Sequence, residues 1–173
     1  MGRVTAAVER RERQLRRRAL DNAMLREYHR RYREGLWRYM LGGSVATMIT
    51  APVVYSLLLP FVVLDGWVSA FEAICFRAWR IRRVKRRDYI AIDRHRLSYL
   101  NGLEKANCMY CSYVNGLLAY VREVAARTEE HWCPIRHARR VRGAHSHYAG
   151  FAAYGDAAGY RTAIPSLRAR ARR

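Results

Sequence analysis

Residues 39–64 read YMLGGSVATMITAPVVYSLLLPFVVL, an uncharged run in a chain of 173 residues whose formal net charge is +19. About 20 apolar residues in a helix cross the hydrocarbon core of a bilayer, so this run is long enough to do so. Its prolines Pro52 and Pro60 and its two glycines are better tolerated in membrane helices than in soluble ones. The run starts too far from the N-terminus for a signal peptide. We therefore expect residues 39–79 to be a membrane-embedded segment.

Two topologies fit this segment, because the apolar character continues past Asp65 and is interrupted only by Glu72. In the first, residues 39–64 cross once and residues 66–79 lie along the interface. In the second, the whole stretch is a re-entrant hairpin that turns near Pro60. Basic flanks on both sides favour the hairpin, since Arg and Lys prefer the cytoplasmic side; its short limbs argue against it. The aromatic residues expected at headgroup depth in the first topology are Trp67, Phe71, Phe76 and Trp79.

The positive charge lies in the flanks. Residues 1–38 hold 12 basic and 5 acidic side chains, and residues 136–173 hold 9 basic and one acidic. Residues 88–135 are nearly neutral, with 5 basic and 6 acidic. We expect residues 1–38 to form a basic amphipathic helix, and residues 77–87 to bind anionic headgroups. The basic residues of that second segment are Arg77, Arg80, Arg82, Arg83, Lys85, Arg86 and Arg87.

A Cys-x2-Cys pair, Cys108 and Cys111, is followed by Cys133 and His137 at Cys-x3-His spacing. Three thiolates and one imidazole can close a tetrahedral shell around zinc, and such a closed shell is structural rather than hydrolytic. His131 is an alternate fourth ligand. An iron–sulfur cluster or haem is a less favoured cofactor, since iron–sulfur motifs carry more cysteines and no CxxCH is present. A thiol–disulfide role for the pair is a further alternative, as is burial of apolar cysteines with an unrelated histidine.

Residues 80–137 are expected to form this small helical metal-binding domain. Apolar residues recur at three- and four-residue spacing over residues 94–130, which predicts a pair of helices. Asn115-Gly116 could bend or break the run. Pro134 should end the helix before Cys133 and start a turn in which Cys133 and His137 share a face.

Beyond residue 138 the composition turns to Ala, Gly, Arg and Tyr with little periodicity, which predicts a disordered basic tail at residues 138–173. His145 and His147 lie in that tail, and their spacing alone is weak evidence for a metal. The glutamates of residues 104–130 are explained by charged helix faces. We find no convincing nucleophile–base set and expect a protein that is not an enzyme.

Residues 86–140 resemble a family of small, uncharacterised bacterial membrane proteins. The shared motifs are RRDY, YLN, EK-x-NC-x-YC, NGL-x-AYVRE, AARTE and WCPI-x-H, which here run from Arg86 to His137. The resemblance covers about a third of the chain. It implies a shared domain and a bacterial source, and it brings no known activity.

The sequence thus predicts a mainly α protein of the bacterial inner membrane, with its metal domain in the cytoplasm. Its expected role is a scaffold or docking subunit that contacts anionic lipid and a protein partner in a membrane complex. An electron-transfer accessory subunit is the first alternative. A basic nucleic-acid-binding zinc protein is the second, disfavoured because the charge is segregated from the cysteine segment.

Overall fold

The structure is a computed structural model that describes residues 14, 22–25 and 27–172. The described residues are mainly helical, as the sequence predicts. By their contacts they divide into two compact units. Unit 1 comprises the residues up to Ala51 together with Ile92–Tyr110, and unit 2 comprises Pro52–Ala91 and Cys111–Arg173.

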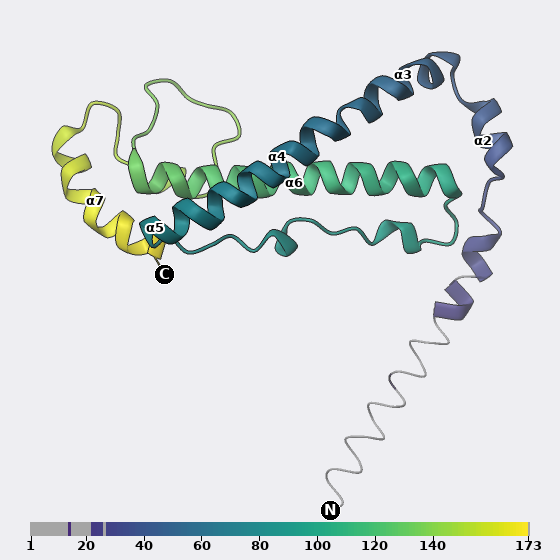
Figure 1. Ribbon diagram of the computed structural model, residues 1–173, viewed down its shortest axis with the longest axis horizontal. Helices are drawn as coiled ribbons and strands as arrows, with labels where there is room; N and C mark the ends of the chain where they lie inside the picture. The colour runs from purple at the N-terminus through teal and green to yellow at the C-terminus, as the bar shows by residue number, and fades with distance from the viewer. Residues whose placement is uncertain (1–13, 15–21, 26, 173) are drawn as a thin grey trace, which may run out of the picture. The chain divides into compact units, whose positions relative to one another are not determined.

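The apolar run forms part of one helix, Val45–Trp79, which consists of four successive pieces (Figure 1). These are α3 (Val45–Ser56), α4 (Leu58–Phe71), the π-helical turn η1 (Glu72–Phe76) and α5 (Arg77–Trp79). Pro60 lies in the first turn of α4 and has no N–H to give to the carbonyl of Ser56, which accounts for the break at Leu57. The chain does not fold back near Pro60, so the described structure does not contain the hairpin.

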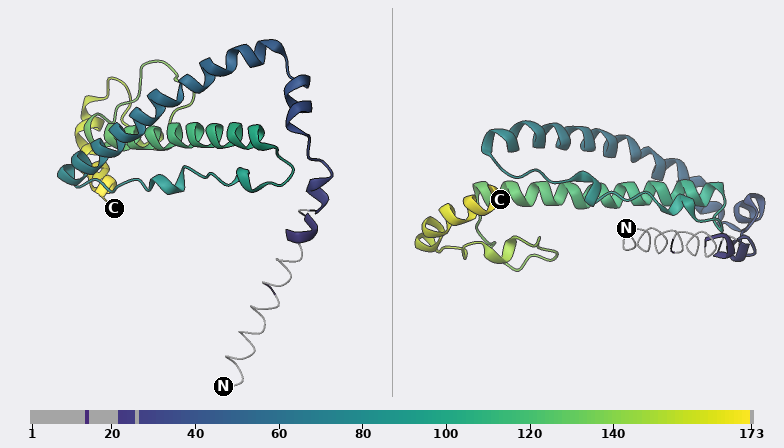
Figure 2. Two further views of the ribbon diagram at one scale, coloured as in Figure 1. Left: turned by 45° about the vertical axis from the view of Figure 1, so that its right-hand side comes forward. Right: turned by 90° about the horizontal axis from the view of Figure 1, so that it is seen from below.

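The long helix ends at Arg80, which takes the left-handed conformation at φ 57°. The N–H of Ile81 bonds the carbonyl of Phe76 at 2.8 Å, and the N–H of Arg80 bonds that of Arg77 at 3.3 Å. This is a Schellman cap, and its two apolar partners, Phe76 and Ile81, both lie in the core. The cap turns the chain sharply, so the residues after Arg80 run back beside α6 (Figure 2).

The cysteine segment is one unbroken helix, α6 (Gly102–Trp132), rather than a helical pair. Asn101 and Glu104 form a capping box at its start: the Asn101 side chain accepts the N–H of Glu104 at 3.0 Å, and the Glu104 carboxylate accepts the N–H of Asn101 at 2.8 Å. Before it, residues 80–101 contain only the short 3-10 turns η2 (Arg86–Asp88) and η3 (Arg94–Arg96). The helix predicted to begin at residue 94 therefore begins eight residues later.

Gly116 does not break α6. A Cβ at this position would lie 2.6 Å from the carbonyl oxygen of Tyr89 and 2.8 Å from Cα of Ile90. The glycine lets the returning segment pack backbone-close against α6. The Asn115-Gly116 pair is thus a packing feature of a continuous helix.

The C-terminal region is ordered rather than disordered, which corrects the sequence prediction for the described part of residues 138–173. It contains η4 (Tyr148–Gly150) and α7 (Ala157–Arg172), and Ile135 pairs with Ala152 in an isolated parallel bridge. Asp156 caps α7 by accepting the N–H of Gly159 at 2.9 Å. Three of its apolar residues, Phe151, Leu167 and Ala171, are buried.

The hydrophobic core lies in unit 2, where the last third of the long helix, the returning segment, α6 and α7 meet. Phe71 and Phe76 are packed in this core, which removes them from the headgroup depth expected for them. Trp79 is half-buried against His131 and Trp132, while Trp67 is 78% exposed. The buried members of the core are Phe76, Ile81, Val84, Leu117, Tyr120, Val124 and Ala171.

Unit 1 contains α2 (Leu36–Gly42) and the start of α3 and of α6. The His29 ring packs edge-on to Tyr99, with centroids 4.9 Å apart. Most of the basic helix predicted for residues 1–38 lies outside the described residues; residues 22–25 and 27–30 are helical.

Candidate functional site

The four predicted metal ligands do not come together. Cys111 lies in α6, and Cys133 follows the last residue of that helix. Twenty-two residues at about 1.5 Å each place them roughly 33 Å apart along the axis. Cys108 lies one turn before Cys111, so it is no closer to Cys133.

The second half of the motif, Cys133 and His137, does not come together either. Residues 133–137 are not helical, so Cys133 and His137 do not share a helix face. The His137 ring instead stacks on Tyr148, and the alternate ligand His131 stacks on Trp79. Among the described residues, no group of three or more His, Cys, Asp or Glu side chains is placed to hold a metal ion. In this arrangement a zinc ion on the CxxC pair would need two ligands from elsewhere.

The polar site that unit 2 does build begins with Asp65 of α4. Its carboxylate accepts hydrogen bonds from Nε of Arg86 and from the hydroxyl of Tyr113, each at 2.9 Å. Arg86 belongs to the returning segment and Tyr113 to α6. The carboxylate raises the pKa of Arg86 above its usual value, and burial together with the Asp65 bond raises the pKa of Tyr113.

Glu72, seven residues after Asp65, repeats the arrangement two turns along the helix. It is 1% exposed and accepts hydrogen bonds from the hydroxyl of Tyr120 at 2.9 Å and from the backbone N–H of Val84. Arg83 lies 3.7 Å from the same carboxylate. Burial, the first cause, raises the pKa of Tyr120, and the Glu72 bond adds to it. Glu72 opens the π-helical turn, a feature common at functional positions.

The two carboxylates thus form two rungs, each made of one acid from the long helix, one tyrosine from α6 and one arginine from the returning segment. The tyrosines, like the acids, are seven residues apart, so both helices present the rungs in the same register. A buried carboxylate destabilises the folded state unless it is paired with a cation and hydrogen-bonded. Asp65 and Glu72 each meet both conditions. Arg83 and Arg86, expected to bind lipid headgroups, each pair with one of these acids.

A second polar cluster joins α6 to the C-terminal region. His147 lies between Glu123 and Glu130, Nε2 of His145 is 2.9 Å from Oε2 of Glu129, and Nε of Arg170 donates to Glu130 at 2.6 Å. Burial alone would raise the pKa of Glu123, but hydrogen bonds from Arg127 and His147 outweigh it and the pKa is lowered. These residues were assigned from the sequence to a disordered tail and to solvated helix faces.

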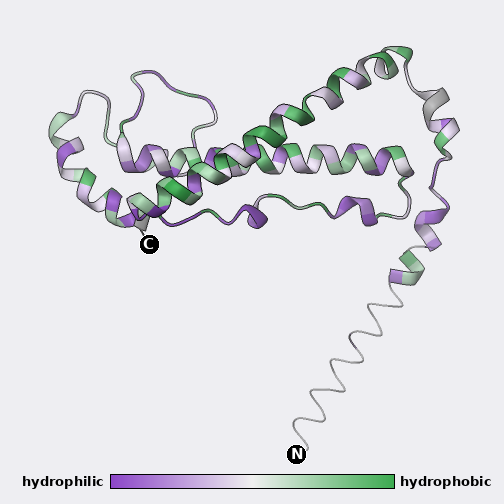
Figure 3. Cartoon of the chain, in the orientation of Figure 1, coloured by the Kyte–Doolittle hydropathy of each residue, from purple (hydrophilic) through white to green (hydrophobic). Residues whose placement is uncertain are grey.

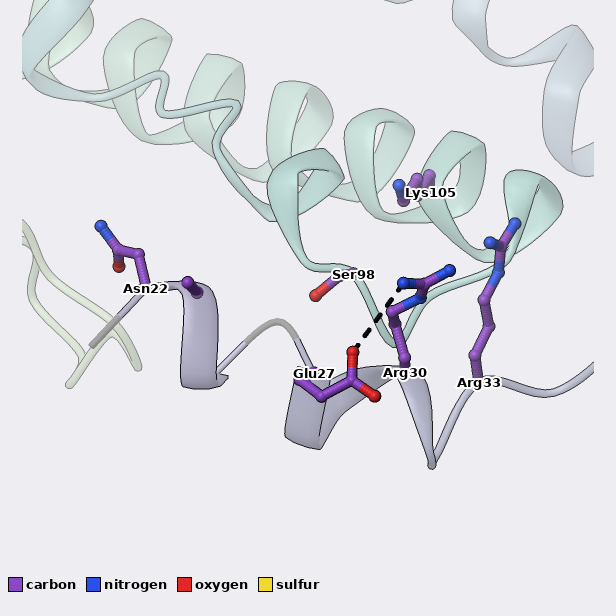
Figure 4. A pocket seen from close by; sticks show the side chains of 7 residues that line it. Asn22, Glu27, Arg30, Arg33, Ser98 and Lys105 are labelled. Atoms are coloured by element: carbon purple, nitrogen blue, oxygen red, sulfur yellow. Dashed lines mark ion pairs between the residues drawn. The ribbon is translucent and has the colours of Figure 1, made fainter. Parts of the chain in front are cut away.

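Unit 1 carries an open groove of about 640 Å³ (Figure 4). Glu27 and Arg30, one turn apart in the same helical stretch, pair at 3.8 Å, but their side chains are 66% and 74% exposed, so the pair contributes little. The groove is a solvated surface rather than a built site. Its lining residues are Asn22, Ala23, Glu27, Arg30, Arg33, Ser98 and Lys105.

Comparison of the chain with protein families, with curated proteins and with solved structures found no match. The resemblance of residues 86–140 therefore assigns no family. The function has to be argued from the residues themselves.

Proposed function

We propose that the protein is a non-enzymatic docking subunit held in the bacterial inner membrane by residues 45–64, with the part of unit 2 beyond Leu64 in the cytoplasm. The observation that carries the proposal is the division of the long helix at Asp65. The preceding 20 residues are uncharged and largely exposed, while both acids of the remainder are paired inside unit 2. At about 1.5 Å per residue, 20 residues span roughly 30 Å, the thickness of a bilayer core.

The polar side chains of the proposed anchor suit a lipid environment. The hydroxyl of Thr50 donates to the carbonyl of Ala46 at 2.8 Å, and that of Ser56 to the carbonyl of Val53 at 2.7 Å. Hydroxyl groups satisfied within their own helix can face hydrocarbon without an unpaired donor. The ribbon of the proposed anchor is coloured mostly as hydrophobic residues (Figure 3), as expected of a segment that enters lipid.

A single crossing separates residues 22–33 from residues 98–105, so it excludes the contact between His29 and Tyr99. The apolar side chains of the span favour the crossing. Eleven Leu, Ile, Val and Phe residues lie between Val45 and Leu64, and insertion at about 0.3–0.6 kcal/mol each gives roughly 3–7 kcal/mol. One ring–ring contact is worth about 0.5–1.5 kcal/mol. We therefore propose that the inserted chain lacks the contact.

A cytoplasmic position for unit 2 is supported by its thiols. All four cysteines of the chain are free, and Cys111 and Cys133 are exposed. Exposed thiols persist in the reducing cytoplasm and tend to oxidise outside it. Lys85 and Arg87 flank Arg86, which Asp65 holds at the proposed membrane boundary, so they are the basic residues best placed to reach headgroups.

The docking face proposed is the arginine loop, residues 136–142. Trp132, at the base of this loop, packs on Trp79 with ring centroids 5.3 Å apart, and Trp79 lies about 22 Å beyond Leu64 along the helix. This exceeds the screening length of about 8 Å at physiological salt, so headgroups of the same membrane do not neutralise the loop. Among the described residues its arginines form no ion pair with a carboxylate. They are Arg136, Arg139, Arg140 and Arg142.

The chemistry of the loop favours a protein partner that presents carboxylates around an apolar patch. Trp132, Ile135 and Val141 are exposed among the arginines. Aromatic residues and arginine are enriched at protein interfaces. A nucleic acid would bind the arginines through its phosphates, but it would gain little from contact with the exposed aliphatic side chains.

The anchor is tested by Val53→Arg/Leu59→Arg, which places two charges at exposed positions of the proposed span. Each charge costs about 2.5–3.5 kcal/mol near the bilayer centre, so we expect the variant, unlike the wild type, to be released from membranes by alkaline carbonate. Ile74→Arg is the matched control, since Ile74 is also exposed on the long helix but lies beyond Leu64. Equal extraction of the two variants, or extraction of the wild type, would refute the anchor.

The docking face is tested by replacing the four arginines of the loop with glutamine. We expect the wild type to bind a peptide of alternating Glu and Leu more tightly than polyglutamate of equal charge, and the variant to lose binding to both. Arg161→Gln, an exposed arginine of α7, serves as control. Stronger binding to duplex DNA, falling steeply with salt, would support the nucleic-acid alternative instead.

A further inference from the structure

His147 lies between two carboxylates of α6. Its Nδ1 is 2.8 Å from Oε2 of Glu130, and its Nε2 is 3.2 Å from Oε1 of Glu123. The Glu130 side chain is 1% exposed and the His147 side chain 22%. A neutral imidazole carries one N–H, so only the imidazolium can donate to both carboxylates. Both contacts are therefore hydrogen bonds donated by the ring only when His147 is protonated.

The charged groups around His147 come from three elements. On α6, Arg127 bonds Oε1 of Glu123 at 2.8 Å; on α7, Arg170 bonds Glu130. In the loop itself, the His145 ring centroid is 5.9 Å from that of His147, and His145 is bonded to Glu129. If His147 loses its proton, both flanking carboxylates remain charged because they keep their arginines. A ring lone pair then faces a carboxylate oxygen, and the contact becomes repulsive.

The loop that His147 holds is joined to the end of α6 by further bonds. The N–H of Ala152 bonds the carbonyl of Pro134 at 2.9 Å, and the N–H of Arg136 bonds the carbonyl of Ala152 at 2.8 Å. The hydroxyl of Tyr148 accepts the N–H of His137 at 2.7 Å. These bonds join residues 148–152 to residues 134–137. The position of the arginine loop, residues 136–142, therefore depends on that of residues 145–152.

We propose that residues 145–152 form a latch that is closed on α6 when His147 is protonated and loosened when it is neutral. Imidazole groups generally change charge between about pH 5 and 8, so the latch is tested across that range. It would regulate how rigidly residues 136–142 are presented. This consequence rests on the proposed docking role, whereas the latch itself does not.

The direction of the latch's pH dependence follows from thermodynamic linkage. Two carboxylates favour the protonated ring in the closed state, so closure and protonation favour each other. Closure is therefore strongest at the acidic end of the range and weakens as pH rises. Glu123 stays charged at mildly acidic pH because its pKa is lowered.

The test is hydrogen exchange of the full chain in nanodiscs at about pH 5.5 and 8, expressed as protection factors that remove the intrinsic pH dependence of exchange. We expect protection of the Ala152 and Arg136 amides to fall about tenfold at the higher pH, the scale of one charge-assisted hydrogen bond. The Leu117 amide in the core should not change. His147→Gln should give the same protection at both pH values.

His137→Gln is the matched control, since His137 is an exposed histidine of the same region that stacks on Tyr148; it should keep the wild-type difference. Glu123→Gln leaves His147 one carboxylate and should reduce the difference, which keeps the latch testable if His147→Gln does not fold. Equal wild-type protection at both pH values would overturn the latch. So would a full pH response in His147→Gln, or an equal loss of protection at Leu117.

Discussion

Gly116 shows how one side chain, or its absence, decides the packing of unit 2. From the sequence, Asn115-Gly116 was a candidate break in a helical run. In the structure the glycine lies inside α6, with the Tyr89–Ile90 backbone against it. Local sequence shows that glycine tolerates unusual conformations, but the close approach comes from a segment 26 residues away and has no local signal.

Gly116→Ala is expected to destabilise unit 2 by about 1–3 kcal/mol, because backbone atoms cannot move aside for the added Cβ. Urea unfolding followed by tryptophan fluorescence measures the change. Gly66→Ala is the matched control, since Gly66 is also helical and has no atom within 4 Å of the added Cβ. It should be neutral or stabilise by up to about 1 kcal/mol. Equal effects of the two substitutions would contradict the packing described here.

The two rungs were only partly visible in the sequence. Asp65 and Glu72 were recognised as exceptions in an apolar stretch, and their seven-residue spacing matches that of Tyr113 and Tyr120. The spacing indicates a shared face, but which faces meet depends on tertiary pairing. For the seven basic residues at 77–87 the sequence was equally ambiguous. A run of like charges does not show which of its side chains pair with acids of the same protein.

At the level of elements, helix content was predictable and helix extent was not. The uncharged run marks its own position, and the structure confirms one helix long and apolar enough to cross a membrane. The run does not indicate that the helix continues for fifteen residues past Leu64, because the continuation depends on core contacts of Phe71 and Phe76. Likewise α7 is rich in Ala and Arg, which are good helix formers, but its lack of periodicity concealed it.

The cysteine motif illustrates the difference between spacing and distance. A 21-residue gap between ligand pairs suits zinc only if the chain turns back within it. Here the gap is filled by continuous α6, so it separates the pairs by about six helical turns. Glu123 and Glu130 of α6 instead meet His147, which comes from a segment predicted to be disordered.

Across the whole molecule, the described residues account for a membrane-length apolar helix and a packed unit with paired acids and an unneutralised arginine loop. In unit 2 the carboxylates of the long helix and of α6 are bonded to arginine, tyrosine or histidine. These bonds stabilise the fold. They leave the arginine loop, residues 136–142, without a carboxylate partner among the described residues. This arrangement is the basis for our proposal that the protein joins an acidic partner to a membrane.

The most direct test of this account is the topology of the chain in the native membrane. Glu34→Cys and Tyr154→Cys, each in a background without the four native cysteines, are treated in sealed vesicles with a membrane-impermeant maleimide. A single crossing by residues 45–64 predicts that the two positions are labelled from opposite sides, and that cysteines at positions 29 and 99 do not cross-link. Labelling of both positions from the same side, together with efficient 29–99 cross-linking, would contradict it.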